Sequence, residues 1–387
     1  MRFEFSTAGR IVFGPGTLAE LRNALREQGA RRLLIVHGAN ARRADPVAEI
    51  ARETGVDCVR FPVPCEPTTA IVTEGVRLAR EAECDGVIGF GGGSVMDAAK
   101  AIASLAANPG EVMDYLEVIG GGRALEKPSL PWIAIPTTAG AGTEVTRNAV
   151  IISPEHRVKA SLRSTLLLAR LAIVDPELTR DLPPAITAAT GLDALTQLIE
   201  PYVCTRANPM TDGLCLEGMR RVARSLRRAF ENGAADGEAR EDMALASLFG
   251  GLALANAGLG AVHGFAAPIG GMFPQAPHGA VCAALLPHVM RANLRALRER
   301  DPGSAALHRY DHVARILTGH DRAQAEEGVT WVAELCAALR IPALGFHSIA
   351  AADIPVLVQN ALRASSMKPN PVALTSDELA GILQAAI

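Results

Sequence analysis

The sequence lacks several features that would place it in a specialised class of proteins. It has no run of about eighteen apolar residues, so no segment is predicted to span a membrane. Its seven cysteines are scattered, odd in number and without a CxxC pair. This pattern argues against a disulfide framework and a cysteine zinc site, and it favours reduced thiols in a cytoplasmic protein. Most of these cysteines are interpreted as small apolar fillers.

An excess of charge of one sign is also missing. The chain has 38 Lys and Arg against 41 Asp and Glu, and no basic patch that would indicate a nucleic-acid partner. The first fourteen residues alternate apolar and polar side chains, which predicts a strand and not a signal peptide. With 387 residues, 49% of them hydrophobic, the chain is expected to be a soluble globular protein of two domains.

From residue 1 to about 180, short apolar runs alternate with amphipathic stretches. Strands are predicted for the runs at 33–36, 87–90, 132–135 and 171–174. Helical spacing is found at 17–28, 46–54 and 70–83. Strand, helix and strand in repetition predict a parallel sheet covered by helices on both faces.

After Asp175 the pattern becomes helical. Segments rich in Ala and Leu predict helices at about 184–205, 209–230, 238–257, 278–299 and 322–339. The predicted fold is therefore an α/β N-terminal domain, residues 1–180, followed by an all-α C-terminal domain, residues 181–387.

A glycine-rich turn follows the strand predicted at 87–90. Gly91–Ser94 leads directly into a predicted helix at 95–106. Backbone amides at a helix start favour an anion, and glycine lets a pyrophosphate approach the backbone closely. The turn matches neither the Walker A loop nor G-x-G-x-x-G, in which Ser94 would have to be glycine. A tight strand-to-helix turn without a ligand is the alternative interpretation.

A second loop, PTTAGAGTE at 136–144, follows the strand predicted at 132–135. In open α/β sheets, ligands bind in the crevice at the carboxyl ends of the strands. Two loops of small and hydroxyl residues that face one crevice favour a dinucleotide site over a simple turn.

The segment from Gly260 to Gly279 holds His263 and His278 among Gly, Ala, Pro and apolar residues. Such imidazoles are either satisfied core histidines or metal ligands, and a bare His pair is a weak signal for a metal. Asp193, upstream on a predicted helix, favours the second interpretation. A divalent cation beside a bound nucleotide would explain the carboxylate, the imidazoles and the glycine-rich turn together.

The sequence resembles the iron-containing (group III) alcohol dehydrogenase family nearly from end to end. The segments that carry the resemblance are RIVFGPGTLAEL, EPTTAIVTEGVRLAREAECDGVIGFGGGSVMDAAKA, IPTTAGAGTEVTRNAVI, IVDPELTRDLPP, GLDALTQLIEPYV, GLGAVHGFAAPIGG, APHGAVCAALLPHV and NPVALTSDELAGIL. The resemblance implies a Rossmann-like N-terminal domain, a helical C-terminal domain (the dehydroquinate synthase-like fold), and NAD or NADP in a cleft between them. It also implies a small alcohol or aldehyde substrate and a homo-oligomer, commonly a dimer.

The resemblance also assigns site residues. Those that match the cofactor site are Gly92, Gly93, Ser94 and Asp97 in the pyrophosphate loop, Thr137, Thr138 and Thr143 in the second loop, and Lys159, which looks like the lysine that reaches the cofactor ribose. Asp193, His263 and His278 match the family's ligands for a divalent metal, Fe²⁺ or Zn²⁺, and are the catalytic candidates. The implied reaction is hydride transfer between a nicotinamide and an alcohol/carbonyl pair, with the metal as Lewis acid.

The choice between NAD and NADP depends on the residues after the strand at 33–36. NAD-specific members of the family carry an acidic residue there, whereas this chain has His37, Gly38, Ala39 and Asn40, followed by Arg42 and Arg43. A missing carboxylate and nearby guanidinium groups favour the 2′-phosphate of NADP. The alternative is that both arginines open a solvated helix.

Three departures from the family pattern concern the metal site. Gln197, which shares a helix face with Asp193, replaces the family's histidine, and an amide oxygen is a weaker ligand for Fe²⁺ or Zn²⁺. The interval from His263 to His278 holds one residue more than usual, near Gln275. Ala267 stands where many members carry a histidine near the substrate.

These departures leave alternatives open. Gln197 or water is the fourth ligand of a weaker metal site, or the chain works without a metal, as in the family's maleylacetate reductase branch, or it binds a nucleotide and has lost catalysis. The intact Asp193 favours a metal. A glycerol dehydrogenase or dehydroquinate synthase type on the same plan is a further alternative, but GGGSVMDAAK and PTTAGAGTE fit the alcohol dehydrogenases better.

Overall fold

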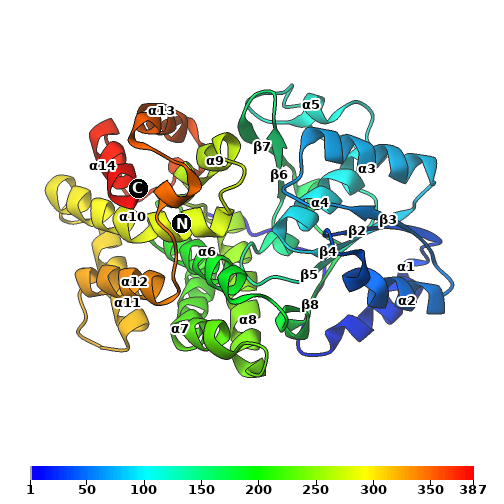
Figure 1. The fold of residues 1–387 in the computed structure, drawn as a ribbon, viewed down its shortest axis with the longest axis horizontal. Helices are drawn as coiled ribbons and strands as arrows, with labels where there is room; N and C mark the ends of the chain where they lie inside the picture. The colour runs from blue at the N-terminus through cyan, green and yellow to red at the C-terminus, as the bar shows by residue number, and fades with distance from the viewer. Residues whose placement is uncertain (1) are drawn as a thin grey trace. The chain divides into compact units, whose positions relative to one another are not determined.

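The computed structural model describes residues 2–387, so Met1, the first residue of the predicted N-terminal strand, lies outside the described residues. The chain divides into two compact units, coloured along the chain in Figure 1. An α/β unit comprises Phe5–Thr138 and Gly142–Thr179. A helical unit comprises Arg180–Ile387, together with Ala139–Ala141 and the residues up to Glu4.

A parallel sheet forms the centre of the α/β unit. Its strands are β1 (Ile11–Phe13), β2 (Arg32–His37), β3 (Asp57–Pro62), β4 (Gly86–Gly91), β5 (Trp132–Pro136) and β8 (Leu171–Val174). Their order is β1-β8-β5-β4-β2-β3, and each neighbouring pair is parallel. The chain leaves β2 toward β3 on one side and leaves β4 toward β5 on the other. The carboxyl ends of β2 and β4 therefore form a topological switch point, where open α/β sheets bind ligands.

Helices cover both faces of this sheet (Figure 1). They are α1 (Leu21–Gln28), α2 (Asp45–Glu53), α3 (Thr69–Glu81), α4 (Gly93–Ala107) and the short α5 (Val112–Tyr115). Leu25 of α1 and Val47 of α2 share a core with Ile88 of β4. Gly89 points to the opposite face, where a Cβ would lie 2.9 Å from the Cβ of Ala99 in α4. Both faces are thus buried, which is why the strands read as continuous apolar runs.

The pattern did not predict every element of this unit. The strands β3, β6 (Asn148–Ser153) and β7 (Val158–Arg163) are additional, and β6 and β7 form a separate antiparallel hairpin. The alternation over the first fourteen residues is wrong as a long strand, because only β1 pairs with the sheet. Short 3₁₀ helices lie at η1 (Thr17–Glu20), η2 (Ala41–Ala44), η3 (Thr143–Val145), η4 (Thr165–Leu167) and η5 (Pro176–Thr179).

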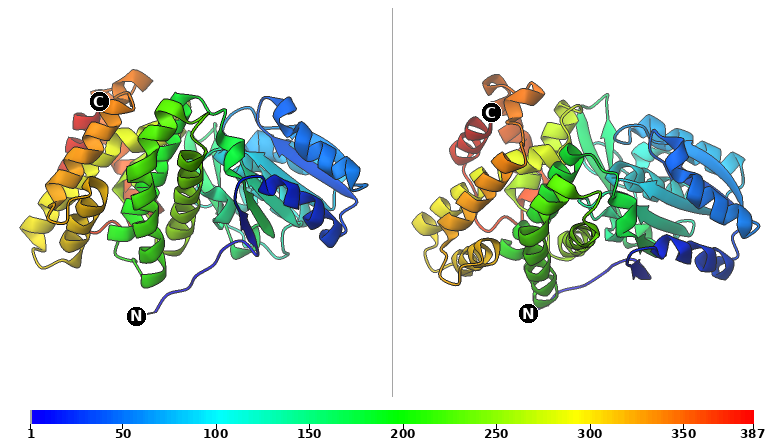
Figure 2. Two further views of the ribbon diagram at one scale, coloured as in Figure 1. Left: turned by 90° about the horizontal axis from the view of Figure 1, so that it is seen from below. Right: turned by 60° about the horizontal axis from the view of Figure 1, so that its bottom comes forward.

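The second unit is built from helices. They are α6 (Pro184–Val203), α7 (Pro209–Asn232), α8 (Gly237–Asn256), α9 (Ala261–Met272), α10 (His278–Arg300), α11 (Ala305–Thr318), α12 (Ala325–Ala338), α13 (Ile354–Arg363) and α14 (Ser376–Ala386), with 3₁₀ helices η6 (Leu344–His347), η7 (Ala351–Asp353) and η8 (Ser365–Met367). No strand occurs among the described residues after β8, so the predicted fold class is confirmed. Figure 2 shows α6, α7 and α8 side by side. Gly191 permits this approach, because a Cβ there would lie 2.2 Å from a methyl carbon of Leu226.

Helix α9 forms against its local sequence. It contains Gly264, Pro268, Gly270 and Gly271, all poor residues for a helix interior. Its apolar side chains, such as Phe265, are fully buried, so tertiary packing rather than propensity stabilises it.

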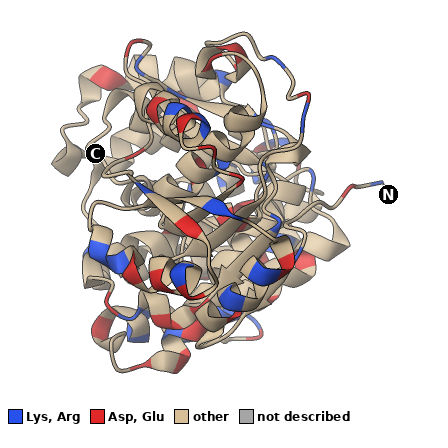
Figure 3. Cartoon of the chain, turned by 90° about the vertical axis from the view of Figure 1, so that its right-hand side faces the viewer, with Lys and Arg blue, Asp and Glu red and all other residues tan. Residues whose placement is uncertain are grey.

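None of the helices between residues 2 and 387 is by itself long and apolar enough to cross a membrane. Helices α8 and α9 pass that test only as a pair, which bends by 96°. Acidic and basic segments alternate along the helices of the face drawn in Figure 3. Exposed ion pairs on the helices, such as Arg77 with Glu74 and Glu81 on α3, each contribute little to stability.

Candidate functional site

Three polar side chains line one face of the apolar helix α6. Asp193, Gln197 and Glu200 follow one another at spacings of four and three residues, so they project from the same side. All three are at most 4% exposed. Polar groups buried to this degree need partners, because an unpaired buried group costs free energy. Asp193 and Gln197 thus share one face of α6, as predicted, and Glu200 lies on the same face.

Glu200 binds the start of helix α9. The α9 N-cap, Gly260, has no side chain to accept the first backbone N–H groups. Instead, the backbone N–H of Val262 donates to Glu200 Oε1 at 2.7 Å, and that of Ala261 donates to Asn370 Oδ1 at 3.0 Å. A Cβ at Gly260 would lie 2.8 Å from Glu200 Oε1, so a larger residue would displace the carboxylate.

The same carboxylate orients His263. Nδ1 of His263 lies 2.7 Å from Glu200 Oε2, and an imidazole that donates from Nδ1 keeps its lone pair on Nε2. Nε2 lies 3.4 Å from Asp193 Oδ1. A carboxylate behind the distal nitrogen is the usual arrangement for a metal-binding histidine. Sequence reasoning missed Glu200, and the available signal was its position seven residues after Asp193.

Helix α10 supplies His278 and, one turn later, Cys282. His278 Nε2 lies 3.9 Å from Asp193 Oδ1, and the two imidazole rings have their centroids 5.5 Å apart. Cys282 Sγ is buried at 3.6 Å from His278 Nε2 and 3.9 Å from His263 Nε2. The ligand atoms of Asp193, His263, His278 and Cys282 all lie within 4.8 Å of one another. The structure thus brings the three predicted metal residues together and adds Cys282, which the sequence pattern did not single out.

Two oxygens in this region have no hydrogen-bond donor among the described residues. They are Asp193 Oδ1 and Gln197 Oε1, and both are buried. Burial by itself raises the pKa of the Asp193 carboxyl, but His278 and His263 beside it more than offset this effect and lower the pKa. A buried carboxylate oxygen without a donor, facing imidazole nitrogens and a sulfur, fits a divalent cation.

Two of the departures from the family pattern, the additional residue near Gln275 and Ala267, can be located in the structure. Gln275, near which the additional residue was placed, is exposed in the short connection between α9 and α10. The additional residue does not prevent His263 and His278 from lying in one cluster. Ala267 lies within α9 and is partly exposed.

In the α/β unit, Gly38, the glycine-rich turn and the threonine loop lie at the carboxyl edge of the sheet. Phe90 of β4 pairs with His37 of β2, and Gly91 pairs with Pro136 of β5. Gly38, the glycine-rich turn and the threonine loop follow these three neighbouring strands directly. The glycine-rich turn therefore lies between Gly38 and the threonine loop at this edge, where open α/β sheets bind ligands.

The glycine-rich turn lies against the threonine loop. A Cβ at Gly92 would be 3.3 Å from Oγ1 of Thr138, and the backbone N–H of Thr137 donates to the carbonyl of Gly91 at 2.8 Å. Gly92 is the N-cap of α4 and offers no side-chain cap to the helix start. Gly93 and Ser94 form the first turn of α4, and both are partly exposed. These features suit a pyrophosphate at the helix start.

Asp97 and Thr143 surround a buried lysine that sequence reasoning missed. The Lys100 ammonium donates to the carbonyls of Thr143, Thr146 and Asn148 and lies near the Thr146 hydroxyl, at 2.8–2.9 Å. Burial lowers the pKa of Lys100, with Asp97 and Glu144 opposing the shift. Burial also raises the pKa of Glu144, to about 7.

Lys159 lies on β7 and forms an ion pair with Glu66. Its side chain is largely buried, at 5% exposure. The hairpin that carries it is tied to the start of α3 by a hydrogen bond from the Ile152 amide to the Pro67 carbonyl at 2.8 Å. The Lys159 ammonium, which is predicted to reach the cofactor ribose, thus already has a local carboxylate as its partner.

The residues that bear on NAD or NADP lie directly after β2. No atom lies within 4 Å of a Cβ built on Gly38, so this position is open. Asn40 caps the short helix η2, and Arg43 donates to the Leu178 carbonyl at 3.3 Å. Arg42 is exposed.

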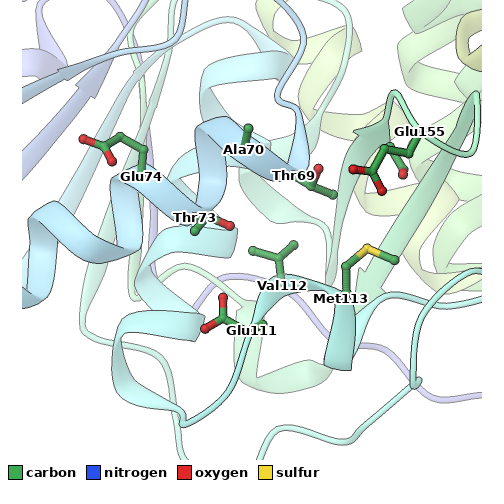
Figure 4. Close-up of a pocket in the computed structure, with 9 residues that line it drawn as sticks. Thr69, Ala70, Thr73, Glu74, Glu111, Val112, Met113 and Glu155 are labelled. Atoms are coloured by element: carbon green, nitrogen blue, oxygen red, sulfur yellow. The ribbon is translucent and has the colours of Figure 1, made fainter.

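A separate surface pocket of about 380 Å³ lies in the α/β unit (Figure 4). Its lining comprises Thr69, Ala70, Thr73, Glu74, Glu111, Val112, Met113, Ser153 and Glu155. None of the predicted site residues is among them. Three glutamates in this lining make it unsuited to a pyrophosphate.

A parallel sheet with a glycine-rich turn at its switch point, and a carboxylate–imidazole cluster on helices, are the parts of a nucleotide-linked metal dehydrogenase. Two family models match the chain: iron-containing alcohol dehydrogenase over residues 8–176, and the C-terminal region of the Fe-containing alcohol dehydrogenase family over residues 187–387. The chain belongs to the iron-containing alcohol dehydrogenase family. It is accordingly an oxidoreductase that acts on CH–OH groups, in a family that uses NAD(H) and iron.

Individual relatives agree over the full length. Alcohol dehydrogenase 4 of Schizosaccharomyces pombe is 36% identical over 381 residues, which cover 97% of this chain and 87% of that protein. The NAD-dependent methanol dehydrogenase of Bacillus methanolicus is 35% identical over 387 residues, 97% of each chain. The crystal structure of a 1,3-propanediol oxidoreductase matches with a TM-score of 0.92 at 32% identity, and all of both chains is covered.

Proposed function

We propose that the chain catalyses reversible hydride transfer between NAD(P) and a small alcohol, with Asp193, His263 and His278 holding a divalent ion. The observation that carries this proposal is the buried, donor-free Oδ1 of Asp193 within 4.8 Å of the imidazole nitrogens. We also propose that residues 1–180 form the dinucleotide-binding domain and that 181–387 form the metal and substrate domain.

A bound divalent ion supplies a Lewis acid that stabilises the alkoxide form of an alcohol. Glu200 would hold a proton of His263 on Nδ1, which leaves Nε2 as the nitrogen that binds the ion. A bound nicotinamide would accept the hydride as the alcohol's O–H and C–H bonds break and the carbonyl forms. We propose that the proton leaves to solvent, since Ala267 stands where many family members carry a histidine and offers no side-chain acceptor.

On the cofactor side, we assign roles by position. Gly92, Gly93 and Ser94 offer backbone N–H groups at the start of α4 to the pyrophosphate. Thr137 and Thr138 offer hydroxyls from the adjacent strand end. Asp97, Thr143 and Lys159 complete the proposed cofactor site.

We propose NADP as the preferred cofactor, with the NAD-dependent Bacillus methanolicus relative as the opposing precedent. The open position at Gly38 and the exposed Arg42 leave room and positive charge for a 2′-phosphate. Gly38→Asp should move the ratio of kcat/KM for the two cofactors toward NAD by about tenfold or more, or about 1.4 kcal/mol. A wild-type kcat/KM for NAD equal to or above that for NADP would contradict the preference.

The proposal is tested by metal analysis of the purified protein, followed by a panel of alcohols, aldehydes and ketones with both cofactors. Asp193→Ala should lose the ion and at least about 100-fold in kcat/KM. Asp301→Ala, an exposed aspartate directly after α10, is the control and should retain both. Full activity in Asp193→Ala and indifference to chelators would favour a metal-independent reductase. Tight NAD(P)H binding without turnover would favour a binding protein that has lost catalysis.

We further propose a cytoplasmic homo-oligomer, most simply a dimer. The seven cysteines are all free, as expected for a reducing compartment. Light scattering coupled to gel filtration measures the mass of the assembly. A monomeric mass at micromolar concentration would contradict the dimer.

A further inference from the structure

Cys282 occupies a position that its sequence context does not explain. It lies one helical turn after His278 on α10, so both side chains project from one face. Its side chain is fully buried, and its sulfur approaches both imidazole Nε2 atoms. A thiol that served only as apolar filler would not need two polar neighbours at this range.

The distances match the edges of a tetrahedron around one ion. With metal–nitrogen and metal–oxygen bonds of about 2.0–2.1 Å and a metal–sulfur bond of about 2.3 Å, tetrahedral ligands lie about 3.3–3.6 Å apart. The structure gives 3.4 Å from Asp193 Oδ1 to His263 Nε2 and 3.6 Å from Cys282 Sγ to His278 Nε2. The two remaining measured separations are 3.9 Å each. The other two separations, from Asp193 to Cys282 and from His263 to His278, are at most 4.8 Å, so all four atoms can approach one ion if the side chains move closer together.

We propose that Cys282 is the fourth protein ligand of the metal, in place of the histidine that the family carries at position 197. The ligand set is then one carboxylate, two imidazoles and one thiolate. On binding, the S–H bond breaks, a sulfur–metal bond forms, and the proton passes to solvent. A thiolate is a soft ligand that favours Zn²⁺, whereas an amide oxygen suits hard cations. This inference rests on the proposed metal site and adds the preference of that site for zinc over iron.

Gln197 is the competing candidate for the same role. Its buried Oε1 also has no donor among the described residues. It is a neutral ligand, however, and binds a divalent transition metal more weakly than a thiolate. A Cβ on Gly250 would lie 3.2 Å from this oxygen, which shows that α8 approaches it closely. If Cys282 is the fourth ligand, changing it alone should alter the metal site, and if Gln197 is the fourth ligand, changing Gln197 alone should do so.

Cobalt substitution tests the proposal. Wild-type protein stripped of metal and loaded with Co²⁺ should show visible d–d bands together with a near-ultraviolet thiolate-to-cobalt band. Cys282→Ser should retain cobalt and lose the thiolate band, and its zinc affinity should fall by at least about tenfold. Cys215→Ser, at an equally buried cysteine on α7, is the matched control and should retain the band. Gln197→Ala should retain it as well.

The outcomes distinguish failure of the role of Cys282 from failure of the proposed metal site. Cobalt bound without a thiolate band would overturn the role of Cys282 and leave the metal-dependent dehydrogenase intact. No stoichiometric binding of cobalt or zinc to the wild type would overturn both. If Cys282→Ser does not fold, X-ray absorption at the zinc edge of the wild type decides. One sulfur at about 2.3 Å supports the proposal, and a shell of nitrogen and oxygen alone refutes it.

Discussion

Lys100 in the α/β unit and Asp193 in the helical unit are both buried ionisable groups, but their surroundings differ. The Lys100 ammonium has four oxygens at 2.8–2.9 Å, three of them backbone carbonyls. Asp193 Oδ1 has no donor. A buried charge whose bonding capacity is filled by its own fold stabilises that fold, whereas an unfilled one indicates a ligand. Burial of charge alone would not have distinguished them.

The largest effect on stability is expected at Lys100. Lys100→Met keeps much of the side-chain volume but leaves the Thr143, Thr146 and Asn148 carbonyls without their buried donor. The free energy of unfolding should fall by about 3–5 kcal/mol, measured by urea denaturation. Zinc affinity, measured in the same variant, should not change. A loss below about 1 kcal/mol would contradict the structural role given to this lysine.

Glu144, beside Lys100, should make stability depend on pH. Its pKa is about 7 in the folded chain against an ordinary value of 4.5, so the folded state holds an additional proton between these values. Stability contributed by this group therefore falls as pH rises from about 4.5 to 7, by about 3 kcal/mol in total. Glu144→Gln should remove this slope and be more stable than wild type at pH 8. Parallel stability curves for the two proteins from pH 4 to 8 would refute the prediction.

A smaller effect, on metal affinity, is expected from Glu200. Glu200→Gln weakens the acceptor behind His263 Nδ1, and zinc affinity should fall by about 10–100-fold, or about 1.4–2.7 kcal/mol. Competition with a chromogenic chelator measures it. Glu334→Gln, at an exposed glutamate on α12, is the control. Equal zinc affinities in the two variants would mean that Glu200 caps α9 without contributing to metal binding.

The smallest effect on stability should come from Asp193 itself. Its Oδ1 accepts no hydrogen bond in the fold, and Asp193→Asn removes both the cost of burying the carboxylate and its attraction to the imidazoles, which oppose each other, so the unfolding free energy of the metal-free protein should change by less than about 1 kcal/mol. Denaturation in the presence of a chelator measures this. A loss as large as that of Lys100→Met would erase the contrast between the two groups.

The fold was predictable where one pattern dominates. The buried strands β2, β4, β5 and β8 read as apolar runs, because helices cover both faces. The edge strand β3, with the sequence DCVRFP, lacks such a run and escaped prediction. Helix α9 also escaped prediction, because its glycines and Pro268 have low helix propensity and the helix is stabilised by tertiary packing.

In the candidate site, too, some residues could be predicted from the sequence and others could not. Asp193, His263 and His278 carry residue types that suggest a metal even without coordinates. Glu200 and Cys282 acquire their surroundings only when α9 and α10 pack on α6, a contact over 62 residues of sequence in the case of Glu200 and Val262. A glutamate in a helix is usually solvated, and a lone cysteine usually fills apolar space. The local sequence therefore gives no reason to predict either residue as part of a site.

The carboxylate of Glu200 both accepts the Val262 amide in the first turn of α9 and orients the ring of His263. We therefore expect fraying of that helix end to be coupled to release of the imidazole. We expect the rate at which a chelator extracts the ion to follow the rate at which the Val262 amide exchanges its hydrogen with solvent. The lifetime of the loaded enzyme would then be governed by a single helical turn.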